Sequence, residues 1–210
     1  MTSEKQKNSK WEMVELPGGI TTSRGSWYHI TSSEIEKYVP GLLNLVSLEK
    51  IIKEADAWLN SPAPLAILVY FLSYFLGLEP LYACFLSVAF FVFWHSNVSA
   101  FVSAGFTPFI KLANSDVLIY FVSGALLIWM SFNEQLTALW YGLGVFFIIK
   151  PGLLKLLIST LFKNKFERSD RVLNMLLIRY GMKEGILTGA IKEMERQFFE
   201  TSYYHKSKKK

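Results

Sequence analysis

The side chains that could do chemistry inside an apolar surrounding are two glutamates and one histidine. Glu79 and Glu134 each interrupt a long apolar stretch, and His95 lies near the end of another. Ionisable groups within a membrane are costly and often mark an ion or proton path. These three residues are therefore the candidates for such a path. The interpretation we favour is structural: the glutamates keep two turns at water, and His95 lies near lipid headgroups.

The remaining reactive residue types form no catalytic or metal-binding pattern. The three histidines, His29, His95 and His205, share no metal-ligand spacing. The one cysteine, Cys84, excludes a disulfide within the chain, and we expect a small buried apolar side chain there. The sequence has no glycine-rich phosphate loop, nucleophile elbow or zinc helix signature. We expect a protein that is not an enzyme and needs no cofactor.

A central apolar block, residues 63–149, sets the expected fold class. The chain is 51% hydrophobic, and its apolar residues are concentrated in this block, which is typical of a membrane protein. We expect two hairpins, at 63–102 and 117–149, with turns at Glu79-Pro80 and Asn133-Glu134-Gln135. The prediction is an all-α integral membrane protein with four short transmembrane helices. An amphipathic N-terminal helix and a C-terminal cytoplasmic helix pair complete the expected fold.

The expected hairpins are short for a bilayer. A helix over 63–78 is about 24 Å long and one over 136–149 about 21 Å, against a hydrocarbon core of roughly 30 Å. Short hairpins would thin or bend the membrane around them. The two hairpins also resemble parallel copies, because residues 68–73 (LVYFLS) match residues 118–123 (LIYFVS) at four positions of six.

The flanking segments divide by composition. We expect an irregular N-terminal arm over 1–30, an amphipathic helical segment over 31–62 and a basic juxtamembrane helix over 150–165. A helix pair over 166–200 and a basic tail over 201–210 follow. Within 31–62, a short helix is expected from Glu34, after Ser33. A longer helix over Leu42–Leu59 is expected to have one apolar face and a polar face that includes Asp56.

The C-terminal helix pair offers a surface for a protein partner or for self-association. Ser169 is expected to cap a helix over 170–180, and Gly181 to end it. A second helix over 183–199 would carry an apolar stripe. The stripe residues that we assign to partner docking are Leu187, Ile191, Met194 and Phe198. Two amphipathic helices must bury such stripes against something.

The distribution of charge predicts lipid contact and orientation. Residues 150–210 carry fourteen Lys/Arg against six Asp/Glu, whereas the block 63–149 contains Lys111 as its one basic residue. Basic segments beside a membrane bind anionic headgroups, and the positive-inside rule places both termini in the cytoplasm. The membrane would be a bacterial inner membrane or the endoplasmic reticulum, and nucleic acid is not an expected partner. The expected headgroup contacts are Lys150, Lys155, Lys163, Lys165, Lys206, Lys208, Lys209 and Lys210.

The whole pattern over 42–149, short paired hairpins with flanking amphipathic helices, resembles the reticulon-type membrane-shaping proteins. It departs from them in the short linker at 103–116. The expected function is a non-enzymatic integral membrane scaffold or accessory subunit of a membrane complex, with membrane shaping as one role. The alternative is a small oligomeric channel or transporter subunit, with Glu79, His95 or Glu134 on its path.

Overall fold

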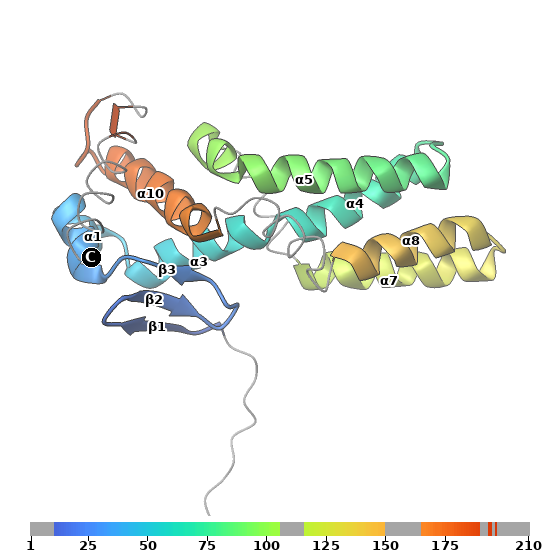
Figure 1. Ribbon diagram of the computed structural model, residues 1–210, viewed down its shortest axis with the longest axis horizontal. Coiled ribbons are helices and arrows are strands. Elements are labelled where there is room, and N and C mark those ends of the chain that lie inside the picture. Colours follow the sequence, from blue (N-terminus) through green and yellow to red (C-terminus); the bar gives the residue numbers. More distant parts are fainter. Residues whose placement is uncertain (1–10, 106–115, 150–164, 190–192, 195, 197–210) are drawn as a thin grey trace, which may run out of the picture. The chain divides into compact units, whose positions relative to one another are not determined.

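The computed structural model describes residues 11–105, 116–149, 165–189, 193, 194 and 196. The chain divides into two compact units. The terminal unit combines residues 1–56 with residues 169–210, and the hairpin unit is residues 57–168. The division falls inside helix α3 (Leu48–Asn60) and inside helix α10 (Lys165–Lys183). Helices dominate the described residues of both units, as expected (Figure 1).

The terminal unit begins with a three-stranded antiparallel sheet in the order β1-β2-β3. Its strands are β1 (Met13–Leu16), β2 (Gly19–Thr22) and β3 (Trp27–Tyr28). The prediction of an irregular arm is therefore wrong for residues 13–28. The strands are too short for an alternating pattern to show in the sequence. Gly19 has a φ of 149°, and a Cβ at Gly19 would lie 2.1 Å from the Tyr28 carbonyl oxygen. The sheet thus needs glycine where the sequence suggested only a break.

Two short helices and α3 follow the sheet. Helix α1 (Ser32–Tyr38) has a capping box in which Thr31, rather than Ser33, pairs with Glu34. The expected single helix over Leu42–Leu59 is interrupted, because α2 (Leu42–Leu45) ends before Ser47 and α3 starts after it. Ser47 Oγ accepts a hydrogen bond from Lys50 N–H at 3.4 Å, as a new N-cap would.

Helix α10 differs from the expected helix at both ends. It begins at Lys165, so Ser169 lies inside it, and the Ser169 hydroxyl donates to the Trp27 carbonyl at 2.7 Å. Gly181 also lies inside it and does not end it. The Leu187 side chain packs against Gly181, since a Cβ at Gly181 would be 2.7 Å from Leu187 Cδ1. Residues 184–189 form turns rather than the start of the second expected helix. Residues 193, 194 and 196 of that predicted helix are helical, and residues 190–192, 195 and 197–199 lie outside the described residues.

The hairpin unit consists of α4 (Pro62–Phe75), α5 (Pro80–Ala104), α7 (Asp116–Phe132) and α8 (Leu136–Ile149). Figure 1 shows the two antiparallel pairs, α4 with α5 and α7 with α8. The bounds of these helices lie within three residues of those expected for the two hairpins. Glu134, in the second turn, has a left-handed φ of 56°. Helix α4 also packs on α7 and α8, which makes the four helices one bundle.

The interior of this bundle is apolar, and a tyrosine within it forms a hydrogen bond between two of its helices. Its buried residues are Ala66, Ile67, Tyr70, Phe71, Ala83, Phe91, Leu127, Met130, Ala138, Val145 and Ile149. The Tyr70 hydroxyl donates to the Ala138 carbonyl at 2.6 Å. Gly142 makes room for the Tyr70 ring, since a Cβ there would lie 3.0 Å from Tyr70 Cε1. Small residues thus let α8 approach α4 closely.

Candidate functional site

The outer surface of the hairpin unit is the feature that most needs a functional explanation. Its described helices and turns expose nineteen large apolar side chains to the surroundings. They are Leu72, Phe75, Leu76, Leu78, Leu81, Tyr82, Phe85, Leu86, Phe93, Leu118, Phe121, Val122, Ile128, Trp129, Phe132, Leu136, Trp140, Phe147 and Ile148. The described part of the terminal unit exposes three, Val14, Leu16 and Leu45. A surface this apolar is unlike that of a soluble monomer and marks contact with lipid or protein.

Helix length distinguishes α5 from the other three. Among the described helices, α5 is the one that is long and apolar enough to cross a membrane. Of its most apolar 18-residue stretch, 33% is buried within the structure. Helices α4 and α8 have fourteen residues each and α7 has seventeen. At 1.5 Å per residue, α4 and α8 reach about 21 Å and α5 about 37 Å.

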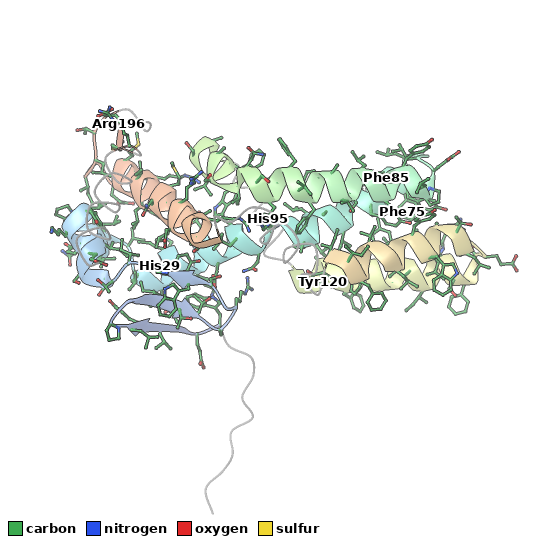
Figure 2. The ribbon with its side chains drawn as sticks, in the orientation of Figure 1. His29, Phe75, Phe85, His95, Tyr120 and Arg196 are labelled. Carbon is green, nitrogen blue, oxygen red and sulfur yellow. The ribbon has the colours of Figure 1, made fainter. Side chains whose placement is uncertain are left out.

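The two hairpin turns are joined at one end of the bundle. The Tyr74 hydroxyl donates to Gln135 Oε1 at 2.8 Å, which links the end of α4 to the start of α8. An open cavity of about 350 Å³ lies at this junction. It is lined by seven residues of the two hairpins: Tyr74, Phe75, Gly77, Leu78, Glu79, Trp129 and Gln135. Figure 2 labels Phe75 at this end of the unit.

The glutamates and His95 do not form one site. Glu79 and Glu134 are both exposed, each in one of the two turns. His95 lies about 24 Å further along α5, at a rise of 1.5 Å per residue. Its imidazole is 8% exposed and stacks on Phe91, with ring centroids 5.5 Å apart. The structure therefore brings the two turns together and leaves His95 well away from them.

His95 instead belongs to a polar cluster that the sequence did not suggest. His95 Nε2 lies 2.9 Å from Arg168 Nη1, and Arg168 Nη2 donates to the Leu59 carbonyl at 3.3 Å. Because a guanidinium only donates, Nε2 accepts and the proton of the neutral imidazole is on Nδ1. Burial lowers the pKa of Arg168 to about 10. The two residues are separated by 73 positions in sequence, so no local pattern could have linked them.

Other polar groups of α4 and α5 are also satisfied within the unit. Trp94 Nε1 donates to Ser61 Oγ at 2.8 Å, and the Ser61 hydroxyl donates to the Trp58 carbonyl at 2.7 Å. The Ser87 hydroxyl donates to the Ala66 carbonyl at 2.6 Å. Buried hydroxyl and indole groups need such partners because leaving one without a hydrogen bond is costly.

The terminal unit holds its own buried polar cluster around Asp56. This carboxylate is 0% exposed and accepts from the Tyr28 hydroxyl at 3.0 Å and from Trp11 Nε1 at 2.9 Å. Asp56 was expected on a polar face, and that expectation is wrong. Burial and the adjacent Asp56 raise the pKa of Tyr28 well above its usual value. The Asp56 cluster fastens α3 to β3 and to the residues before β1, which is a structural role.

A second pair in the terminal unit joins β3 to α10. The His29 backbone N–H donates to Asp170 Oδ1 at 2.8 Å, and His29 Nδ1 lies 3.0 Å from Asp170 Oδ2. Within the part of the chain that the structure describes, no three His, Cys, Asp or Glu side chains form a group that could hold a metal ion.

The remaining predicted site residues are only partly described. Leu187 is half-buried against Gly181, and Met194 is 7% exposed, so neither presents a free docking stripe in this structure. Ile191 and Phe198 lie outside the described residues. The same holds for all of the expected headgroup lysines except Lys165, which begins α10 and whose side chain is not described.

Comparison of the chain with models of known protein families, with curated proteins and with solved structures finds no significant match. The resemblance to reticulon-type proteins therefore remains one of pattern.

Proposed function

We propose that this protein is a non-enzymatic membrane scaffold or accessory subunit whose hairpin unit is embedded in lipid. One observation carries the proposal: nineteen large apolar side chains of that unit are exposed on its outer surface, while Tyr70, Ser87 and Trp94 donate their hydrogen bonds within the unit. Fully burying one large apolar side chain is worth about 1.5–3 kcal/mol, so exposing this surface to water would cost tens of kcal/mol. Lipid removes that cost.

The short helices give the embedded unit a mechanical consequence. Helices α4 and α8, at about 21 Å, fall short of a hydrocarbon core of roughly 30 Å. Either the bilayer around them becomes thinner, or the unit inserts only partway from one side of the bilayer. The mismatch costs fractions of a kcal/mol per Å. Local thinning is how a small protein without a catalytic site would shape a membrane or recruit other proteins to a thin region.

The terminal unit serves as the part outside the lipid. It contains both ends of the chain, and the excess of Lys and Arg at 150–210 favours its placement in the cytoplasm, against the anionic leaflet of a bacterial inner membrane or the endoplasmic reticulum. This unit would also dock a partner or a second copy, but not through Leu187 or Met194, which are half-buried and buried in this structure.

The channel alternative has no comparable support among the described residues. Glu79 and Glu134 lie at the turn end of the bundle, and His95 is bonded to Arg168 instead of facing them. A path through the unit would need ionisable groups at intermediate depths.

Accessible cysteines test the embedding directly. Cys84→Ser removes the one cysteine, and new cysteines at Phe85, Phe121 and Trp140 then probe the hairpin unit, with Ser47 as the matched exposed control in the terminal unit. In carbonate-washed membranes, a water-soluble maleimide should label Ser47→Cys at once and the other three only after detergent is added. Equal labelling of all four without detergent would rule out lipid embedding.

A second assay separates scaffold from channel. Purified protein in liposomes should change bilayer thickness, measured by X-ray scattering, and Glu134→Gln should leave that change intact. Ion flux through the same liposomes that disappears in Glu134→Gln would replace the scaffold with the channel.

A further inference from the structure

The cavity at the joined turns has the composition of a site for an organic cation. Three of its walls are the rings of Tyr74, Phe75 and Trp129. The Tyr74 and Phe75 centroids are 5.6 Å apart with planes at 63°, and those of Phe75 and Trp129 are 6.0 Å apart at 48°. The rings of each pair are inclined to each other and are not stacked. The face of an aromatic ring attracts a cation within about 6 Å of its centroid, and quaternary ammonium groups are bound in this way.

The charges around the cavity favour the same ligand. Glu79 contributes a carboxylate to the wall, and Gln135 Oε1 is held by the Tyr74 hydroxyl. Between residues 57 and 149 the sequence has one basic residue, Lys111, so the described part of the two hairpins contains no Lys or Arg to neutralise Glu79. A carboxylate beside aromatic residues, with no Lys or Arg among the described residues of the two hairpins, is complementary to a positive charge with an apolar surface.

The surroundings of the cavity favour a lipid, and not a dissolved ion, as the molecule that carries the cationic group. Large exposed apolar residues lie close in sequence to those that line it, including Leu76, Tyr82 and Phe132. A ligand held here would have its cationic end among the rings and acyl chains along these side chains. A dissolved cation would leave them uncovered.

We propose that this cavity binds the choline headgroup of a phosphatidylcholine molecule, an inference that rests on the proposed embedding in lipid. Because the cavity lies at the turn end of helices about 21 Å long, a headgroup held there is drawn toward the opposite leaflet. The site thereby couples a lipid type to the local thinning that the short hairpins impose.

Native mass spectrometry of the detergent-solubilised full chain, mixed with equal amounts of phosphatidylcholine and phosphatidylglycerol of the same acyl chains, tests the site. We expect one retained phosphatidylcholine per chain. Trp129→Ala and Glu79→Gln should each weaken its retention about tenfold, as loss of a cation–ring or ionic contact would. Trp140→Ala, the matched control, removes an exposed tryptophan outside the cavity and should change nothing. Tetramethylammonium, the charged group without the acyl chains, should compete only at far higher concentration.

Three results would overturn the inference: no preference for phosphatidylcholine, equal effects of Trp129→Ala and Trp140→Ala, or tetramethylammonium that binds as tightly as the lipid. The maleimide assay applied to the same variants keeps this failure distinct from failure of the embedding. Variants that stay protected in the membrane but lack a choline preference refute the lipid site alone, whereas a wild-type chain labelled without detergent refutes the embedding.

Discussion

The two units of this chain differ in where their apolar and polar side chains lie. In the terminal unit the apolar residues of α3, such as Ile51 and Ile52, are fully buried, and a charged residue, Asp56, is fully buried with partners. In the hairpin unit apolar residues also cover the outside, and the Tyr70 and Ser87 hydroxyls donate to backbone carbonyls of neighbouring helices. The same hydrophobic effect acts on both units. The proposed embedding accounts for the difference, with water around the first unit and lipid around the second.

The largest change in the free energy of unfolding is expected at the Asp56 cluster of the terminal unit. Asp56→Ala leaves the Tyr28 hydroxyl and Trp11 Nε1 without their acceptor and should lower the free energy of unfolding by about 3 kcal/mol. Chemical denaturation followed by near-ultraviolet circular dichroism measures it. Asp56→Asn keeps one acceptor oxygen and should lose about half as much. An Ala variant as stable as the wild type would show that Asp56 contributes nothing to this unit.

The next largest effect is expected from a charge placed on the outer face of the hairpin unit. Such a charge would be favourable if this face lies in water and unfavourable if it lies in lipid. Phe121 is 74% exposed, so in water Phe121→Asp would improve solubility. In lipid the same change should cost about 2.5–3.5 kcal/mol of insertion at mid-depth and reduce the membrane-integrated fraction. Alkaline extraction of expressed variants measures that fraction, with Val14→Asp, in the terminal unit, as the control expected to have no effect. A more soluble, still folded Phe121→Asp protein would break the comparison.

The pH dependence of the terminal unit follows from Tyr28. Burial, followed by the charge of Asp56, raises the pKa of Tyr28 far above its usual value of 10.0. Above that pH the unfolded chain releases the phenolic proton and the folded chain keeps it. Stability is therefore complete below pH 10 and falls as the pH rises, by about 1.4 kcal/mol per pH unit from this group. Denaturation midpoints at several alkaline pH values measure the slope, which Tyr28→Phe should make shallower; an unchanged slope would show that Tyr28 is not its source.

The smallest expected effect probes the interior of the hairpin unit. Tyr70→Phe removes the hydrogen bond to the Ala138 carbonyl while it keeps the ring that packs on Gly142. The loss should be about 1 kcal/mol, measured by unfolding in mixed micelles. Tyr82→Phe, at an exposed position on α5, serves as the control. A much larger loss would mean that the hydrogen bond, rather than packing, holds α4 against α8.

The hairpins could be predicted from the sequence because their signals are local. Long apolar runs define the helices, and Glu79-Pro80 and Asn133-Glu134-Gln135 mark the turns. The strands β1 to β3 could not, because pairing across a turn gives no periodic pattern in segments of two to four residues. Neither could the burial of Asp56, since its partners Trp11 and Tyr28 are 45 and 28 positions away.

The candidate site shows the same division. Glu79 stood out as a charge in an apolar stretch, but Tyr74, Phe75 and Trp129 were ordinary aromatic residues of apolar helices. Only the packing of α7 and α8 on α4 places Trp129 beside the first turn. Arg168 likewise gained its partner His95 only through the fold. Charge and hydropathy are visible along a chain, whereas the meeting of two hairpins is not.

The most direct test of lipid embedding is the collision rate of a spin label with dissolved oxygen and with an aqueous nickel complex in reconstituted liposomes. The label is placed at Phe121 in the hairpin unit or at Val14 in the terminal unit, both in the Cys84→Ser background. The account predicts that the label at 121 meets oxygen and is shielded from nickel, and that the label at 14 meets nickel. Equal nickel collision rates at the two positions would place both units in water and contradict it.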